Sequence, residues 1–134
     1  MEKIWTEMYE AAKAVLSERR ISEYVTCGEV SAAILSKSGK IYTGVCIDTN
    51  STLGICAERN AISTAIAAGE KSKIKKVAIY SPNTKLCWPC GACRQWFTEF
   101  EQGQDMKIIV EDKDGSPIEF TVEDLLPHRF ELIP

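Results

Sequence analysis

Apolar side chains recur at helical spacing along the first segment of the chain. Between Glu2 and Arg19 they lie three or four residues apart, with charged residues between them, at Ile4, Met8, Ala11, Ala12, Val15 and Leu16. This spacing places them on one face of an α-helix. We therefore predict an amphipathic helix over residues 2–19.

The next apolar runs are short and typical of strands. The stretch VSAAILSKSGKIYTGVCI, residues 30–47, is divided by Ser38 and Gly39, which favour a tight turn, and it predicts a hairpin. The run KKVAIYS, residues 75–81, lies between lysines and Pro82. It is long enough for a buried strand and too short for a helix.

Further helices and a second hairpin complete the pattern. AERNAISTAIAAGE, residues 57–70, is Ala-rich and predicts a helix that ends near Gly69. Another helix is predicted to begin at Pro89–Gly91 and to run through RQWFTEF, because proline is tolerated at a helix start. KIIVED and IEFTV flank the turn KDGSP as a hairpin, and EDLLP predicts a short closing helix.

The predicted order αββαβαββα forms one domain over residues 1–134, since no linker, repeat or low-complexity tract interrupts it. Helices that alternate with strands favour a layered α/β fold. Hairpins at both ends favour a mixed sheet over a purely parallel one.

Composition and charge narrow the function. With 45% hydrophobic and 26% charged residues, the chain can bury a core without disulfides or metal. The formal charge of −3 comes from interspersed acids and bases, so we expect a small soluble substrate and no nucleic-acid or membrane partner.

The N-terminus lacks a signal-peptide pattern, and we expect a cytoplasmic protein. In that compartment the six cysteines are better explained as thiols, metal ligands or catalytic groups than as disulfides.

Half of those cysteines lie at the starts of the two middle helices: Cys56, Cys90 and Cys93. A helix N-terminus favours thiolate through its free N–H groups and its dipole. Two cysteines three residues apart, joined by a third from another helix, can bind one zinc ion with three thiolates. The fourth coordination position then stays open for water, which is typical of catalytic zinc sites.

Glu58 follows Cys56 by two residues and can reach over the open position. There it can take a proton from water and pass it to a leaving amine. Three thiolates on a dication leave a formal charge of about −1. Arg59 and Arg94 each adjoin a cysteine motif and can offset this charge by donating hydrogen bonds to ligand sulfurs. The alternative for both is a solvated helix arginine.

The pattern C-A-E-R followed by P-C-G-A-C-R-Q resembles the zinc-dependent cytidine deaminase superfamily. Cysteine in the first ligand position resembles the small three-cysteine branch, which includes cytidine deaminase and blasticidin S deaminase. VSAAILSKSGKIYTGV and VEDLLPHRF extend the resemblance over nearly the whole chain.

The resemblance implies a three-layer α/β/α sandwich with a five-stranded mixed sheet, and a homotetramer with one zinc ion per chain. It also implies hydrolytic removal of an exocyclic amine as ammonia. By position, Cys56, Cys90 and Cys93 match the zinc ligands, and Glu58 matches the proton shuttle.

The substrate region departs from the nucleoside deaminase pattern. Cys46 and Asp48 stand where the family has an Asn-x-Glu pair; a thiol is a weak substitute for an amide, whereas Asp48 can still accept from a hydroxyl. Gly28 stands where the family has phenylalanine. We expect Cys46, Asp48, Trp88 and Phe130 to contact the substrate, Phe130 from a neighbouring subunit. Packing beneath the strand is the alternative for Trp88, and plain interface core is the alternative for Phe130.

The expected substrate is cytidine, deoxycytidine or a nucleoside analogue such as blasticidin S, and two other functions stay open. Trp88 and the C-G-A-C run are similar to a thioredoxin-type dithiol, which would make Cys90 and Cys93 a thiol oxidoreductase pair. That interpretation leaves Cys56 and Glu58 unexplained. A zinc-binding module without turnover is the other possibility, and the intact Glu58 argues against it.

Overall fold

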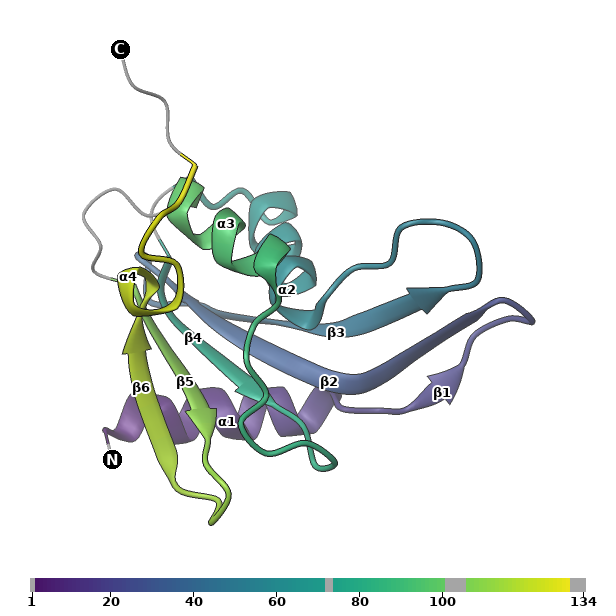
Figure 1. The fold of residues 1–134 in the computed structure, drawn as a ribbon, viewed down its shortest axis with the longest axis horizontal. Coiled ribbons are helices and arrows are strands. Elements are labelled where there is room, and N and C mark those ends of the chain that lie inside the picture. The colour runs from purple at the N-terminus through teal and green to yellow at the C-terminus, as the bar shows by residue number, and fades with distance from the viewer. Residues whose placement is uncertain (1, 72–73, 101–105, 131–134) are drawn as a thin grey trace.

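A computed structural model of the chain describes residues 2–71, 74–100 and 106–130. Within these ranges it contains a six-stranded sheet with helices on both faces (Figure 1). The helices are α1 (Lys3–Val15), α2 (Ala57–Ala67), α3 (Gly91–Phe100) and α4 (Val122–Leu125). The strands are β1 (Arg19–Arg20), β2 (Val25–Ser36), β3 (Ile41–Thr49), β4 (Ile74–Tyr80), β5 (Lys107–Glu111) and β6 (Pro117–Thr121).

Strand β2 organises the sheet. It pairs with β3 over most of its length on one side and with β4 over its C-terminal half on the other, both antiparallel. β4 and β5 are parallel, and β5 and β6 are antiparallel. The sheet is therefore mixed, as the two predicted hairpins indicated.

The helices form two layers around the sheet. On one face, α1 packs Trp5 and Met8 against Ala33 of β2 and its neighbours. On the other face, α2, α3 and α4 cover a larger core that includes Ala32 of β2 and Phe97 of α3. Adjacent residues of β2 thus serve opposite cores, as the alternation of side chains along a strand requires. The predicted three-layer α/β/α architecture is confirmed.

Two details of the prediction are wrong at the N-terminal end. The predicted helix over residues 2–19 is too long, because α1 ends at Val15, and the predicted count of five strands omits β1. Arg19 and Arg20 pair instead with Cys27 and Thr26 of β2. Both arginines are exposed, so this strand of two residues carries no apolar periodicity that could have predicted it.

A bulge in β2 brings the chain after α1 against the sheet. The register between β2 and β3 shifts between Cys27 and Ser31. Gly28 lies within this shift with φ 87°, and a Cβ atom there would overlap the backbone carbonyl of Ser17. Glycine is required at this position both for its left-handed backbone and for the close approach of the neighbouring chain.

Strand β3 and helix α2 pack without intervening side chains at Gly44. A Cβ atom at this residue would lie 2.7 Å from the carbonyl oxygen of Ala57 and 2.8 Å from the carbonyl carbon of Asn60. One residue further, the Asn60 side-chain amide donates to the Val45 carbonyl oxygen at 2.9 Å. Backbone contact and hydrogen bond together fix the first turns of α2 against the sheet.

Candidate functional site

Cys56 lies at the N-cap of α2, after backbone hydrogen bonds that close the loop between β3 and α2. The Ile47 N–H donates to the Ile55 carbonyl at 2.9 Å, and the Ile55 N–H donates to the Ile47 carbonyl at 3.0 Å. The Asn60 N–H then donates to the Cys56 carbonyl at 3.0 Å. The backbone of Cys56 is therefore fixed on both sides at a helix N-terminus, where the dipole favours negative charge.

Cys90 immediately precedes α3, and Cys93 lies in its first turn. The Arg94 N–H donates to the Cys90 carbonyl at 3.0 Å. The Cys93 N–H also points at the Cys90 sulfur, with a distance of 3.5 Å from N to Sγ. The predicted helix start thus places both sulfurs on one side of a tight turn.

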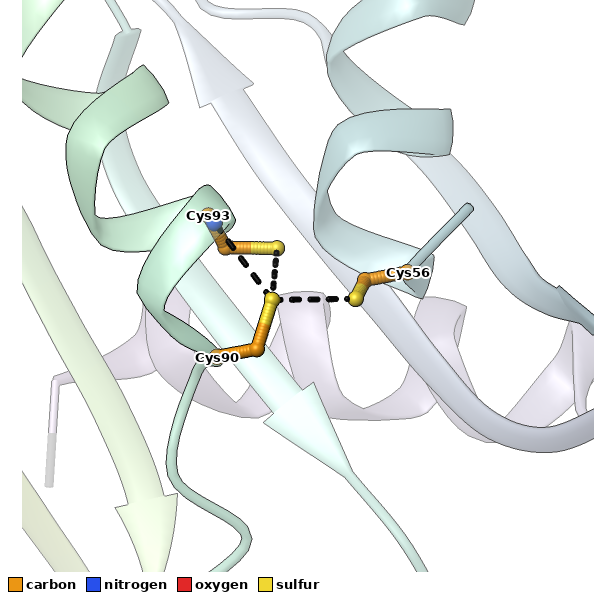
Figure 2. A group of neighbouring side chains, drawn as sticks. All are labelled: Cys56, Cys90 and Cys93. Atoms are coloured by element: carbon orange, nitrogen blue, oxygen red, sulfur yellow. Dashed lines mark hydrogen bonds between the residues drawn. The ribbon is translucent and has the colours of Figure 1, made fainter. Parts of the chain in front are cut away.

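The sulfur atoms of Cys56, Cys90 and Cys93 meet between the two helix starts (Figure 2). The Cys90 sulfur lies 3.2 Å from that of Cys56 and 3.5 Å from that of Cys93, and the three atoms lie within 4.8 Å of one another. All three cysteines are free thiols. Sulfurs around a tetrahedral zinc ion, with Zn–S bonds of about 2.3 Å, lie about 3.8 Å apart. One zinc ion therefore fits this group with small side-chain adjustments, and its fourth position stays open.

The pKa values of the three thiols are shifted in different directions by the surrounding protein. Burial raises the pKa of Cys93 and of Cys56 above the usual value. Burial also acts on Cys90, but the Cys93 N–H and the neighbouring thiols outweigh it, so that the pKa of Cys90 is lowered. Zinc binds cysteine as thiolate. The ion must therefore displace protons from Cys56 and Cys93, and the affinity of the site for zinc should rise with pH.

Glu58 lies in the first turn of α2 and is only 4% exposed. Burial raises the pKa of its carboxyl, while its own backbone N–H and the Cys93 thiol lower that pKa to a smaller extent. Glu58 follows Cys56, the N-cap of α2, by two residues, so it belongs to the helix start at which the sulfur group lies. A buried carboxyl with a perturbed pKa at such a group is a candidate for proton transfer.

Arg59 contacts the sulfur group from the side of α2. Its Nη2 donates to the Cys56 sulfur at 3.5 Å, and its guanidinium lies over the Trp96 ring, 5.8 Å from the centroid. The hydrogen bond to Cys56 is the main reason why the pKa of Arg59 lies above its usual range. The side chain is placed to offset thiolate charge, and that role stays a prediction.

Arg94 makes different contacts from those expected at the sequence level. Its Nε donates to the carbonyl oxygen of Pro89 and its Nη1 to that of Leu125, both at 2.8 Å. These acceptors are backbone groups rather than ligand sulfurs. Arg94 therefore connects the turn before Cys90 to the end of α4.

Cys46 and Asp48 lie on the same face of β3 as Gly44, because side chains alternate along a strand. Gly44 faces α2, so both residues lie on the side of the sheet that carries the sulfur group. The Val30 N–H of β2 donates to the Cys46 sulfur at 3.4 Å, whereas Asp48 is exposed. Their contact with substrate stays a prediction.

Trp88 lies just before α3, on the side that faces β6. Phe130 is the last described residue at the C-terminal end. The Trp88 ring packs on Phe120 of β6, with 4.7 Å between ring centroids, and is 42% exposed. This contact supports packing for Trp88 more than a place in the pocket wall. Phe130 is 72% exposed, although Gln95 holds its backbone through two hydrogen bonds.

Sequence reasoning did not identify Gly44, Asn60 or Gln95 as part of the site. Gly44 interrupts the β-rich run IYTGVCI, and a glycine inside a strand often marks a close backbone approach. That signal could have identified it. Asn60 and Gln95 act on backbone groups that only the tertiary fold brings near, so no local pattern reveals them.

A sequence profile of the cytidine and deoxycytidylate deaminase zinc-binding region matches residues 5–110. The chain therefore belongs to this family of zinc-dependent hydrolases. The family match, the fold and the sulfur group agree with the leading interpretation of the sequence, and they favour it over a thiol oxidoreductase.

Individual relatives and solved structures agree with this assignment. A probable cytidine deaminase from Dictyostelium discoideum is 33% identical over 126 residues, covering 90% of this chain and 84% of that protein. A blasticidin-S deaminase from Bacillus cereus is 29% identical over 109 residues, covering 75% of this chain and 76% of that protein. The crystal structure of cytidine deaminase from Burkholderia pseudomallei has a TM-score of 0.77 and 29% identity, covering 97% of this chain and 100% of that one.

Proposed function

We propose that this chain hydrolyses the exocyclic amine of a cytosine-type ring to a carbonyl and releases ammonia. The observation that carries the proposal is the convergence of three thiols at two helix starts, one of which also carries the buried Glu58 in its first turn. Family membership supports the same reaction class. A thiol oxidoreductase would leave Cys56 and Glu58 without a role.

Cys56, Cys90 and Cys93 would hold the zinc ion. When bound, such an ion supplies an open coordination position at which water is acidified to a pKa of about 7. Glu58 accepts one proton of the attacking water and transfers it to the ring nitrogen; it then takes the remaining proton of the added hydroxyl and transfers it to the amine, which leaves as ammonia. Burial supports this role, because a raised pKa brings the carboxyl closer to the range where it can both accept and donate a proton.

Arg59 offsets the charge of the ligand set in this proposal. Its hydrogen bond to Cys56 withdraws electron density from that thiolate and so reduces the negative charge of the ligand set. Its position over the Trp96 ring helps to fix the guanidinium beside Cys56.

Cytidine, deoxycytidine and blasticidin S are the candidate substrates. The relatives named above carry both activities in their names, which supports both candidates. Cys46 distinguishes them: its sulfur already accepts the Val30 N–H and is a poor substitute for an amide toward a ribose hydroxyl. Asp48 is exposed on the same face and can still accept from a hydroxyl or bind a cationic group.

Zinc-loaded protein should be assayed for ammonia release with cytidine, deoxycytidine, cytosine and blasticidin S. We expect turnover of at least one cytosine-type substrate and about one zinc ion per chain. Cys46→Asn should raise the kcat/KM ratio of cytidine over blasticidin S, and Thr43→Asn serves as the control at a neighbouring position on the opposite face of β3. Zinc-loaded, folded protein that is inactive toward the whole panel would contradict the proposed reaction.

A further inference from the structure

Two adjacent side chains of α3 connect the metal-binding turn to the end of the described chain. Arg94 and Gln95 follow Cys93 directly in sequence. Both reach residues more than thirty positions away, in the stretch 125–130, which we call the C-terminal segment. The hydrogen bonds that they make to the segment go to its backbone. They therefore fix the place of the segment and do not depend on which side chains it carries.

Arg94 joins the two parts through one guanidinium group. Its Nε–H holds the Pro89 carbonyl, directly before Cys90, and its Nη1–H holds the Leu125 carbonyl, both at 2.8 Å. The backbone N–H of Arg94 also donates to the Cys90 carbonyl at 3.0 Å. A planar guanidinium with two short, charge-assisted bonds allows little freedom to either acceptor.

Gln95 holds the other end of the segment. Its side-chain amide donates to the Phe130 carbonyl at 3.0 Å, and its carbonyl oxygen accepts the Phe130 N–H at 3.3 Å. The Phe130 ring is nevertheless 72% exposed, so core packing does not explain why its backbone is fixed. The contacts place an aromatic ring in solvent at a defined distance from α3.

We propose that Arg94 and Gln95 are positioning residues that couple the occupied metal site to the C-terminal segment and hence to the placement of Phe130. The coupling follows from the geometry: Cys90 and Cys93, which would hold the ion, bound a turn that starts next to Pro89, and the Pro89 carbonyl accepts from Arg94. The Arg94 guanidinium is then aligned with the Leu125 carbonyl. Coupling between two sites is reciprocal, so contacts that favour the ordered segment also favour metal binding. The inference rests on the proposed function in one respect, since Phe130 affects KM only if the site takes a substrate.

The first test is hydrogen exchange of the full chain, zinc-loaded and metal-free, followed in peptides that contain residues 126–130. We expect zinc to slow exchange of the Phe130 amide by about fivefold or more, the lower end of typical coupling between two sites. In Gln95→Met this zinc-dependent protection should disappear while zinc stoichiometry and the thiolate charge-transfer spectrum of the Co²⁺-substituted protein stay unchanged. KM should rise in this variant, with kcat within about twofold of wild type.

The second test separates Arg94 from a general structural arginine. Arg94→Met should lower zinc affinity by about tenfold or more, the usual effect of losing a group that orients metal ligands, and should shift the Co²⁺ charge-transfer bands. Arg20→Met is the matched control, because Arg20 also donates to two backbone carbonyls, those of Ser22 and Glu23, far from the site in sequence. The control should bind zinc as wild type does. Zinc affinity is measured by competition with a chromogenic chelator.

Two outcomes would overturn the coupling: equal exchange at residues 126–130 with and without zinc in the wild-type chain, or normal zinc affinity and Co²⁺ spectrum in Arg94→Met. If Arg94→Met does not fold, the exchange result for Gln95→Met decides. Zinc-dependent protection in a protein that deaminates nothing would refute the proposed function and leave the coupling intact. Deamination without such protection would do the reverse.

Discussion

Glu58 combines two properties that usually exclude each other in a stable fold: it is ionisable and only 4% exposed. Burial raises the pKa of its carboxyl, so the folded chain holds the proton more tightly than the unfolded chain does. A group with this environment adds nothing to stability at neutral pH. Its presence is better explained by proton transfer than by packing.

Glu58→Gln should therefore lose catalysis and keep the metal. The amide is close in shape to the carboxyl but cannot accept a proton from water, so kcat should fall by at least about 10²-fold, the typical contribution of a general base. Zinc content measured by atomic absorption should stay at one ion per chain. Near-normal ammonia release from this variant would contradict the role assigned to Glu58.

The same substitution should stabilise the metal-free protein at neutral pH. Because burial raises the folded-state pKa of Glu58 above its ordinary value, the wild-type chain loses stability as pH rises through the folded pKa. Glu58→Gln lacks this loss. In chelator-treated protein, its midpoint of thermal unfolding should exceed that of wild type at pH 7.5, and the difference should shrink toward pH 4. An unchanged difference across this range would show that burial of the carboxyl does not limit stability.

The sequence predicted at this scale that the three thiols would gather at two helix starts, because that arrangement depends on spacing along the chain. Cys90 and Cys93 lie on one helical turn, and Glu58 lies two residues from Cys56, so local geometry already brings these groups together. The partners of Arg94 and Trp88 could not be predicted in the same way. Both depend on β6 or α4, which are about thirty residues distant in sequence and adjacent only in the fold.

At the scale of elements, the contact of β3 with α2 determines where the first ligand and the carboxyl lie. Gly44 lets the strand backbone touch the first turns of the helix, and the Asn60 amide donates to the Val45 carbonyl. Cys56 and Glu58 lie at the start of that helix. Close packing of the strand on the helix therefore also places the face of β3 that carries Cys46 on the side of the sheet where Cys56 and Glu58 lie.

Gly44→Ala should destabilise the protein by about 1–3 kcal/mol, because an added methyl group meets backbone atoms that cannot rotate away. Gly91→Ala is the matched control: a Cβ atom there has no neighbour within 4 Å among the described residues. Chemical denaturation of both variants checks the expectation. A Gly44→Ala protein as stable as the Gly91→Ala protein would mean that α2 can move away from β3 without cost.

The sequence predicted most elements because their apolar positions follow one clear period. The helix before Arg19 and the strand KKVAIYS are examples. It failed where pairing, not periodicity, creates the element: β1 exists only because Arg19 and Arg20 meet the end of β2. This pairing depends on the left-handed backbone at Gly28. Glycine can adopt that conformation but also others, so the presence of glycine in the sequence does not by itself predict it.

At the scale of the whole molecule, several large apolar side chains remain uncovered. Ile21 and Tyr24, in the connection between β1 and β2, are 57% and 62% exposed, and Leu53, in the loop after β3, is 97% exposed. These two segments lie at the same end of the molecule (Figure 1). Among the described residues, no helix has both the length and the apolarity needed to cross a bilayer. Burial against other copies of the chain is one way to cover such side chains, which supports the homotetramer that the family resemblance implies.

Sedimentation velocity should accordingly find the wild-type protein as a tetramer at micromolar concentration. Leu53→Asp should shift it toward smaller species, because a charge at a buried interface position lacks a partner. Asn50→Asp, in the same loop, adds the same charge at an exposed polar residue and should leave the tetramer intact. A wild-type protein that sediments as a monomer would contradict the predicted assembly.

The bulge at Gly28 limits how this enzyme can be redesigned. Where the family pattern has phenylalanine, this backbone is left-handed, and the Ser17 carbonyl occupies the space that a side chain would need. Restoring the aromatic ring would push the chain after α1, and β1 with it, off the sheet. Its expected result is a destabilised protein rather than a change of preference among nucleosides. Substitution at the predicted substrate contacts Cys46 and Asp48 of β3 avoids this obstacle, because neither residue has a left-handed backbone.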